Sequence, residues 1–310
     1  MLKPVKKIFA IEPGFIYKNI QLIHVIIISM NFDDVQNIAY LGPSSSFTEM
    51  AKDLFCEKYN IQAYPLPMQT IKQVVEYVDE NPRSLGVMPV ENTIEGTVCE
   101  AFDSLIRTKN PNVRILAEIV MPISYCLLAR TTEIYSITNI ISHPQALAQC
   151  REFIHNEMPL NMNIIEAAST AEAAKSLQNC NLTYAAIGSH KTAEVYMLNV
   201  LKENINDDKS NRTRFVLVGD YETASTGHDK TSLAFAVDNK PGALLRVLEV
   251  FMKNNINLSY IVSRPSKQRL GEYVFFVAFD GHISNEHILH TIEEVRSKST
   301  FMRFFGSFAR

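Results

Sequence analysis

The amino-acid sequence predicts an α/β fold in two units. Its 310 residues exceed the usual domain size of about 100 to 200 residues. From residue 37 onward, short apolar strands alternate with polar turns and helical periods, which favours helices covering a largely parallel sheet. After residue 226 the order becomes βαββαβ over about 80 residues, the ferredoxin-like pattern of an antiparallel sheet with two helices on one face. We therefore expect a first domain at 37–225 and a second at 226–310.

The expected first domain repeats one arrangement, in which an apolar strand runs directly into polar residues. After a turn at 43–46, Ala51, Leu54 and Phe55 recur at helical spacing. Expected strands span 38–42, 61–64, 85–90, 140–141, 164–165 and 185–187, and a further helix spans 71–78.

The expected second domain begins after a short loop of small and polar residues near Thr226 and Gly227. Domains of this kind have regulatory or ligand-binding roles in many proteins, so the fold alone does not identify the function of this one. Expected strands span 230–237, 257–263, 272–279 and 302–308, and expected helices span 242–253 and 285–295.

Composition and motifs exclude several classes of protein. Hydrophobic residues at 46% and charged residues at 20% are typical of a globular protein, and 30 basic against 33 acidic residues, without a basic stripe, argue against a nucleic-acid partner. The five cysteines lie far apart without a CxxC pair, which indicates buried thiols in a reducing compartment. No nucleotide-binding, hydrolase or metalloprotease motif is present, and the lone His143 favours hydrogen bonding over metal ligation.

The N-terminal stretch superficially resembles a secretory signal, because three lysines at positions 3, 6 and 7 precede the apolar run 25–28. That run is short, follows His24, and lacks a small-x-small cleavage site. No later stretch approaches the about 18 apolar residues of a membrane span. We expect residues 1–36 to be a disordered extension, or a mis-set start with Met30 as the true first residue.

Several expected strand ends feed helix starts that bear hydroxyl groups. Ligands of open α/β sheets bind beyond the carboxyl ends of the strands. A helix N-terminus offers unpaired N–H groups and a partial positive charge, so a cluster of such ends suits a small molecule with carboxylates. A dicarboxylate is the expected ligand.

Each of these segments also has a purely structural interpretation. Ser169 and Glu172 fit the spacing of a capping box, which favours capping for Ser169 and Thr170. For the three serines at 44–46, capping and ligand binding remain equally open. Spacing alone indicates that 211–215 is an ordinary strand with solvated arginines.

Seven segments follow one another from about residue 38 to the C-terminus. They are YLGPSSSFTE from Tyr40, PVENTIEG from Pro89, SHPQALAQC from Ser142, STAEAA from Ser169, NRTRF from Asn211, KPGALLRVL from Lys240 and INLSYIVSRP from Ile256. In this order they resemble the monofunctional prephenate dehydratase family. A single motif of this length would be weak support, whereas seven in the family's order across two domains leave little room for coincidence.

The resemblance implies a catalytic domain of two α/β lobes, similar to type II periplasmic binding proteins, followed by an ACT domain. It implies that prephenate loses water and carbon dioxide to give phenylpyruvate, in L-phenylalanine biosynthesis, without a cofactor or metal. Such a catalyst mainly orients a dicarboxylate and helps hydroxide to leave, which agrees with a site built from helix starts and hydroxyls.

The resemblance also assigns residues to the catalytic cleft. Thr213 would donate a proton or hydrogen bond to the departing hydroxyl, and Arg214 would fix the lobe geometry or a carboxylate. Ser46 and Thr48 would supply hydroxyls for a substrate carboxylate. The remaining residues expected there are Phe215, Glu91, Asn92, Thr93, His143, Gln145, Ser169 and Thr170.

In the ACT domain the resemblance implies phenylalanine at a dimer interface, and hence a homodimer or homotetramer. Gly242, Ala243 and Leu244 would present a helix N-terminus to the carboxylate of the amino acid, although Pro241 and Gly242 also fit a simple turn. Asn257, Leu258, Ser263 and Arg264 would complete the pocket.

The sequence departs from the family pattern at a few positions. Ser45 and Ser46 replace the usual Gly and Thr, which loses glycine's access to positive φ, whereas Thr93 in place of Ser keeps a hydroxyl. Val262 replaces a Glu before the SRP segment, so feedback inhibition by phenylalanine has less support than catalysis. The stretch before residue 37 is shorter than the about 90 residues of a fused chorismate mutase, so we expect no mutase activity.

Three alternatives stay open at this point. Arogenate dehydratase performs the same chemistry on an amino acid, and no residue separates the two substrates. A non-catalytic phenylalanine sensor would account for Ser45 and Ser46, but the intact NRTRF and PVENTIEG segments oppose it. The ACT-like unit and the missing cleavage site oppose a secreted solute-binding protein. We expect a cytoplasmic protein, or a plastid one if the source is a photosynthetic eukaryote.

Overall fold

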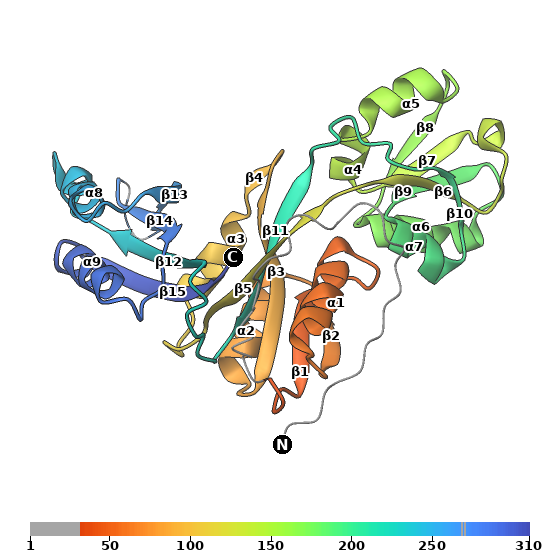
Figure 1. Ribbon diagram of the computed structural model, residues 1–310. Coiled ribbons are helices and arrows are strands. Elements are labelled where there is room, and N and C mark those ends of the chain that lie inside the picture. The colour runs from red at the N-terminus through yellow and green to blue at the C-terminus, as the bar shows by residue number, and fades with distance from the viewer. Residues whose placement is uncertain (1–31, 268, 270) are drawn as a thin grey trace, which may run out of the picture.

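The computed structural model describes residues 32–267, 269 and 271–310. Figure 1 shows three packed units in a row, with a central lobe between a second lobe at the upper right and a C-terminal unit at the left. The N-terminal lysines, the apolar run at 25–28 and Met30 lie outside the described residues. Phe32 and Val35, ahead of the first strand, are buried in the core of the central lobe.

The central lobe is a mixed sheet in the order β2-β1-β3-β11-β5. Strand β1 pairs in parallel with β2 and β3, but β11 runs antiparallel to both β3 and β5. Strands β2, β1, β3 and β5 therefore share one direction, as expected for a largely parallel sheet, and β11 runs against them because it returns from the second lobe. The elements are β1 (Asn37–Leu41), α1 (Phe47–Tyr59), β2 (Tyr64–Met68), α2 (Ile71–Glu80), β3 (Ser84–Asn92), β4 (Gly96–Thr97), α3 (Cys99–Ile106), β5 (Arg114–Pro122) and β11 (Arg212–Gly219).

The strand expected at 61–64 is wrong, since the strand β2 starts at Tyr64. Asn60 adopts a left-handed conformation at the end of α1, and the N–H of Ile61 bonds to the carbonyl of Cys56. Ile61 is buried as the apolar residue that follows a helix C-cap. Strand β2 lies at the edge of the sheet, where its two prolines are tolerated.

The second lobe is a five-stranded sheet in the order β10-β6-β9-β7-β8. Strands β7, β8 and β9 are parallel and contain the strands expected at 140–141, 164–165 and 185–187. Strand β6 pairs antiparallel with both β9 and β10. Its elements are β6 (Cys126–Ala129), η1 (Ile134–Ser136), β7 (Asn139–Ser142), α4 (Pro144–Ala148), α5 (Arg151–Glu157), β8 (Asn163–Glu166), α6 (Thr170–Ser176), η2 (Leu177–Asn179), β9 (Tyr184–Gly188), α7 (His190–Tyr196) and β10 (Asn199–Lys202).

The C-terminal unit confirms the ferredoxin-like prediction. Its antiparallel sheet has the order β13-β14-β12-β15, and both helices pack on one face. Pairing of Ala309 with Ala117 joins it to the central lobe in one 10-stranded sheet. The elements are β12 (Asp229–Ala236), α8 (Ala243–Lys253), β13 (Leu258–Pro265), β14 (Tyr273–Asp280), α9 (Glu286–Ser297) and β15 (Phe301–Ala309).

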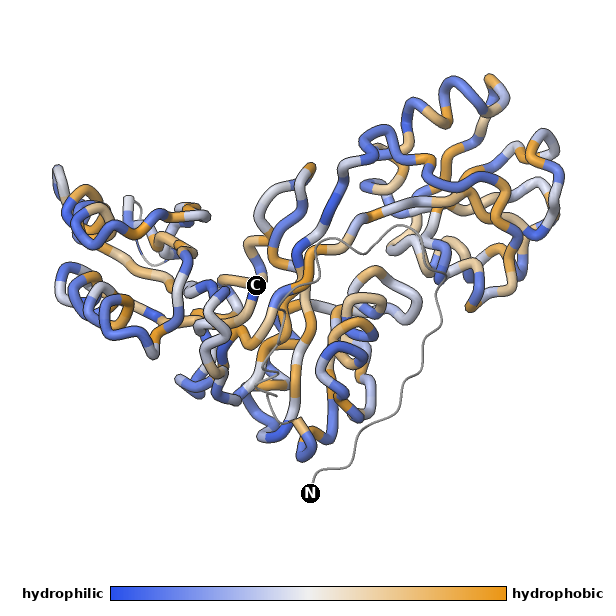
Figure 2. Tube along the Cα trace, in the orientation of Figure 1, coloured by the Kyte–Doolittle hydropathy of each residue, from blue (hydrophilic) through white to orange (hydrophobic). Residues whose placement is uncertain are grey.

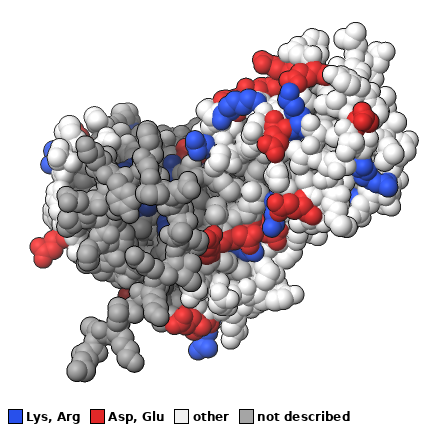
Figure 3. All heavy atoms as spheres, turned by 45° about the vertical axis from the view of Figure 1, so that its right-hand side comes forward, with Lys and Arg blue, Asp and Glu red and all other residues white. Residues whose placement is uncertain are grey.

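Apolar packing holds this unit against the central lobe. The ring of Phe102 on α3 lies 4.9 Å from Phe276 and 5.9 Å from Tyr260, measured between centroids. Figure 2 shows apolar residues concentrated along the strands and polar residues along the outer helices. Acidic and basic side chains are interspersed over the second lobe on the face seen in Figure 3. Among the described residues, no helix has both the length and the apolar character needed to span a membrane.

The turn before α1 connects the two lobes. The carbonyl of Ser45 accepts hydrogen bonds from Ser189 Oγ at 3.4 Å and Thr192 Oγ1 at 3.1 Å, both at the start of α7. Ser45 has φ 65° and is 1% exposed, and its own Oγ has no hydrogen-bond partner among the described residues. This position therefore combines backbone strain with an unsatisfied buried hydroxyl.

Replacing Ser45 by glycine is expected to stabilise the protein. Ser45→Gly relieves the left-handed strain and removes the unsatisfied hydroxyl, while the backbone carbonyl that accepts from the second lobe remains. We expect about 1 kcal/mol of added stability after allowing for glycine's greater unfolded-state entropy, seen as a higher urea midpoint with an unchanged slope. The control is Ser44→Gly, because Ser44 does not have a positive φ. Equal or lower stability for Ser45→Gly would contradict the explanation.

Candidate active site

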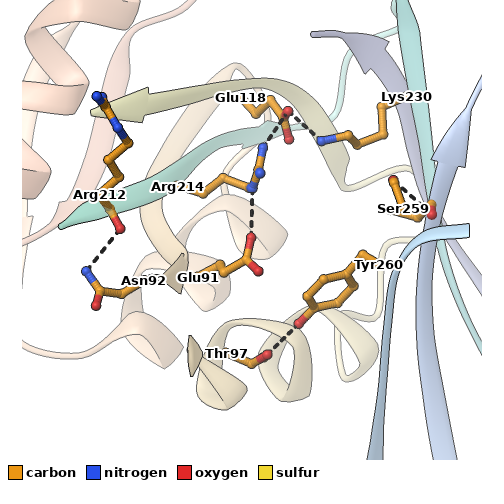
Figure 4. Close-up of polar contacts among 10 residues, drawn as sticks. Glu91, Asn92, Thr97, Glu118, Arg212, Arg214, Lys230, Ser259 and Tyr260 are labelled. Atoms are coloured by element: carbon orange, nitrogen blue, oxygen red, sulfur yellow. Dashed lines mark hydrogen bonds and ion pairs between the residues drawn. The ribbon is translucent and has the colours of Figure 1, made fainter. Parts of the chain in front are cut away.

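Strand β11 presents neighbouring side chains to opposite faces of the central sheet, as period-2 geometry requires. Thr213 is 7% exposed and lies on the face that packs against α1. Phe215 shares that face and is buried in the core beneath it, at 2% exposure. Arg214 points to the other face, toward the C-terminal unit, as Figure 4 shows. The side chains of the TRF segment therefore lie in two environments, one beside α1 and the other beside the C-terminal unit.

Asn92, at the end of β3, holds the hydroxyl of Thr213. Its Nδ2 donates to Thr213 Oγ1 at 2.8 Å, to Asn211 Oδ1 at 2.8 Å and to the Arg212 carbonyl at 3.1 Å, the last drawn in Figure 4. Its Oδ1 accepts from the backbone N–H groups of residues 94 and 95, which fixes the orientation of the amide. Thr213 Oγ1 accepts from Asn92, and no acceptor for its own proton lies among the described residues, so the hydroxyl can donate to a ligand.

The network continues from the central lobe into the second lobe. Asn211 Nδ2 donates to Gln149 Oε1 at 2.9 Å, and Gln149 Nε2 donates to Glu95 Oε1 at 3.1 Å. Gln149 ends α4 and is 7% exposed, and Asn211 is 1% exposed. These three residues were not among the predicted site residues, although they lie within the SHPQALAQC, NRTRF and PVENTIEG segments. The signal for Gln149 was a polar side chain in an otherwise apolar helical stretch.

Other predicted site residues act as helix caps. Ser46 caps α1 by accepting from the N–H of Glu49, and its hydroxyl donates to the Leu41 carbonyl. Ser169 caps α6 by accepting from the N–H of residue 172 at 3.0 Å, which confirms the capping interpretation. His143 Nδ1 caps α4 by accepting from the N–H of Gln145, which confirms a hydrogen-bonding role.

The remaining cleft candidates lie at strand ends and helix starts. Thr93 is exposed and its Oγ1 accepts from the Arg212 N–H at 3.0 Å, beside the Asn92 contact. Thr48 is buried in the first turn of α1, Thr170 is half-buried at the first position of α6, and Gln145 is exposed on α4. The structure thus brings Asn92, Thr93 and Thr213 together.

Glu91 is not on the same face as Asn92. Its Oε2 lies 3.0 Å from Arg214 Nε, and Arg214 Nη1 lies 2.7 Å from Glu118 Oε1. Lys230 of the C-terminal unit lies 2.6 Å from the same Glu118 oxygen (Figure 4). The carboxylates that Arg214 contacts are therefore those of Glu91 and Glu118, beneath the C-terminal unit.

Burial sets the ionisation of this charge cluster. Burial lowers the pKa of Arg214, but the carboxylates of Glu118 and Glu91 outweigh that effect, and the pKa is raised. Burial lowers the pKa of Lys230, and the opposing effect of Glu118 only partly offsets it. Glu118 is thus the anionic partner that both cations share, and it favours the charged form of each. Among the described residues, no group of three or more His, Cys, Asp or Glu could hold a metal.

The predicted phenylalanine-binding residues lie on two elements of the C-terminal unit. Gly242 precedes α8 with φ 76°, Ala243 is buried and Leu244 is half-buried. Arg264, on β13, lies 3.5 Å from Asp103 of α3 and lines a hollow of about 490 Å³ beside the loop at 237–239. Asn257 and Ser263 are exposed, and Leu258 is half-buried against the C-terminal core.

The fold and the site define a two-lobed α/β enzyme with a docked ferredoxin-like domain. A prephenate dehydratase family model matches residues 38–223, and an ACT domain model matches residues 231–297. The chain therefore belongs to the prephenate dehydratase family, and its C-terminal unit is an ACT domain.

Individual relatives cover most of the chain. It is 36% identical over 277 residues to the prephenate dehydratase of Methanocaldococcus jannaschii, which covers 87% of this chain and 97% of the relative. It is 37% identical over 301 residues to a bifunctional chorismate mutase/prephenate dehydratase of Aquifex aeolicus, covering 96% and 81%. The solved prephenate dehydratase of Arthrobacter aurescens in complex with L-Phe matches with a TM-score of 0.79 and 32% identity, covering 88% and 90%.

The inter-lobe link through Gln149 is expected to contribute to stability. Gln149→Met keeps the side-chain volume but leaves the buried Nδ2 of Asn211 without its acceptor. We expect a loss of about 1–3 kcal/mol, the usual cost of an unsatisfied buried donor, measured by urea unfolding. The control is Gln145→Met on the same helix, where the side chain is exposed and a change within about 0.5 kcal/mol is expected. Equal effects at both positions would argue against the link.

Proposed function

We propose that this chain converts prephenate to phenylpyruvate, with loss of water and carbon dioxide, in L-phenylalanine biosynthesis. The observation that supports it is the Thr213 hydroxyl, buried at the end of β11 and oriented by Asn92 with its proton free. Family membership agrees with this assignment.

The chemistry requires positioning and one hydrogen-bond donor. As the bond to the ring carboxylate breaks, its electron pair moves through the ring and expels the hydroxyl, which takes up one proton to leave as water. Carbon dioxide is released and the ring becomes aromatic, which supplies much of the driving force. Thr213 donates to the departing oxygen, and the Asn92 amide stabilises the charge that develops on Thr213 Oγ1.

The ACT domain is proposed to bind L-phenylalanine and to form the contact in a homodimer or homotetramer. The described surface of this domain exposes apolar side chains on α8 and the edge strand β13, including Leu245, Met252 and Ile261. An exposed apolar edge strand is a ready site for pairing with a second copy. The relative from Arthrobacter aurescens is described as a complex with L-Phe.

A cytoplasmic location is proposed from the cysteines. All five are free thiols, and two of them, Cys126 and Cys150, are buried. Burial also raises the pKa of Cys150 to about 12, which keeps that thiol protonated and unreactive. Thiols of this kind persist where the surroundings are reducing.

Removing the Thr213 hydroxyl is expected to abolish most turnover. In Thr213→Val the shape is kept and the donor is lost, so kcat for phenylpyruvate formation should fall by at least about 100-fold, with KM changed little. Thr213→Ser keeps the donor and should stay within about tenfold of the parent protein. Near-full turnover by Thr213→Val would refute the role of this hydroxyl.

The substrate assignment has its own test, which is a paired rate measurement on prephenate and arogenate with the unmodified protein. A higher kcat/KM for prephenate is expected. A higher kcat/KM for arogenate would make arogenate the proposed substrate in place of prephenate. If neither compound gave a product, the non-catalytic phenylalanine sensor would be the remaining alternative.

Phenylalanine is expected to bind the ACT domain and lower turnover. Gly242→Ala should weaken binding, measured by calorimetry, because a side chain at φ 76° strains the start of α8 at a cost of about 1 kcal/mol. Gly227→Ala is the matched control, since Gly227 has φ 85° with open space around it and lies outside the proposed pocket. An unchanged affinity in Gly242→Ala would contradict this placement, and no response of the parent protein to phenylalanine would remove the feedback role.

A further inference from the structure

A line of four charged side chains crosses the interface between the ACT domain and the central lobe. Lys230 of β12 lies 2.6 Å from Glu118 Oε1 of β5, and Arg214 Nη1 of β11 lies 2.7 Å from the same oxygen. The line ends at Glu91 of β3, 3.0 Å from Arg214 Nε. Figure 4 shows Lys230 extending to Glu118 from the ACT side, with Arg214 between Glu118 and Glu91.

The centre of this line is deeply buried. The Glu118 side chain is 8% exposed and the Lys230 side chain is 10% exposed, while Arg214 retains 30%. A buried charge that loses its partner is strongly unfavourable, because little solvent is available to replace the partner. The positions of Lys230 and Arg214 are therefore tied to each other through one carboxylate oxygen.

The other end of the line reaches the proposed catalytic hydroxyl through two backbone pairings. Thr213 pairs with Asn92 and Arg214 pairs with Glu91 in the register of β11 and β3. On one face the two strands are joined by the Arg214–Glu91 ion pair, and on the other by the Asn92–Thr213 hydrogen bond. The same peptide units thus determine where the guanidinium and the hydroxyl lie.

A second ACT contact reaches the same strand end. The hydroxyls of Tyr260 on β13 and Thr97 on β4 lie 2.7 Å apart, and Thr97 pairs with Glu91 in the sheet. A cavity of about 250 Å³ lies between the two contacts, bounded by Glu118, Arg214 and Tyr260 among others. The interface between the ACT sheet and β11 is therefore not closely packed at this point.

We propose that Glu118 and Lys230 are positioning residues that couple the ACT domain to Thr213 through Arg214. We call this path from Lys230 through Glu118 and Arg214 to Thr213 the relay. The inference rests on the proposed function in assigning the substrate contact to Thr213. A displacement of β12 moves Lys230, which changes the charge balance at Glu118 and the position of the Arg214 guanidinium. The backbone of β11 then transmits that change to the Thr213 hydroxyl on the opposite face.

The kinetic test uses the full-length chain with prephenate. In Glu118→Gln, Lys230 and Arg214 face each other without the anion, and kcat per folded molecule should fall about tenfold with KM within about twofold, a coupling of the size seen within charge networks. Adding Lys230→Met removes that repulsion and should restore a large part of the lost kcat. Stability alone would not produce this rescue, because kcat is normalised to folded protein.

The matched control is Asp103→Asn. Asp103 also pairs across the ACT interface, with Lys267 at 2.6 Å and Arg264 at 3.5 Å, but it belongs to α3 and not to the strands around Thr213. Its kcat should stay within about twofold of the parent protein. Equal losses in Asp103→Asn and Glu118→Gln, or no rescue by Lys230→Met, would overturn the relay.

A second readout needs no turnover and therefore separates the relay from the proposed function. The γ-methyl resonance of Thr213, assigned by comparison with Thr213→Val, should shift in Lys230→Met and stay in place in Asp103→Asn. A fixed resonance in Lys230→Met would overturn the relay even if the chain is an active dehydratase. A shifted resonance in a chain that forms no phenylpyruvate would support the relay and refute the dehydratase function.

Discussion

The pairing of β11 between β3 and β5 is the constraint on which the other features depend. This strand returns from the second lobe, so it closes the connection between the lobes and also forms the centre of the sheet beneath the ACT domain. Strand geometry directs Thr213 to the face that packs against α1 and Arg214 to the face that meets the ACT domain. One short segment therefore provides the hydroxyl for chemistry and the cation for the domain contact, and neither can move alone.

Much of this organisation was predictable from residue order, because secondary structure depends largely on residues that are close in sequence. Strand and helix periods depend on neighbours in sequence, so the ferredoxin-like order and the strands that end at 142, 166 and 188 could be predicted. The error at 61–64 arose because Ile61 is apolar for a different reason, as the buried residue after a helix cap.

The side-chain partnerships were less predictable, because they depend on long-range register. Glu91 and Asn92 are adjacent, and only the pairing with β11 shows that one faces Arg214 and the other Thr213. The contact between Asn211 and Gln149 joins residues on different lobes, and no local period signals it. The family resemblance implies roles for the PVENTIEG and NRTRF segments, whereas the division of their side chains between two faces of the sheet follows only from the fold.

Val262 shows how the ACT interface combines packing with charge. It is half-buried beside Tyr260 and packs against the apolar cluster that includes Phe102 and Phe276. A carboxylate at that position would need a cation in the same place, and the nearest basic residue on the strand, Arg264, already pairs with Asp103. Valine therefore makes this part of the contact non-directional, since apolar packing tolerates small displacements. Directional coupling then falls to charged contacts such as Lys230 with Glu118, where a buried oxygen shared by two cations makes the energy sensitive to position.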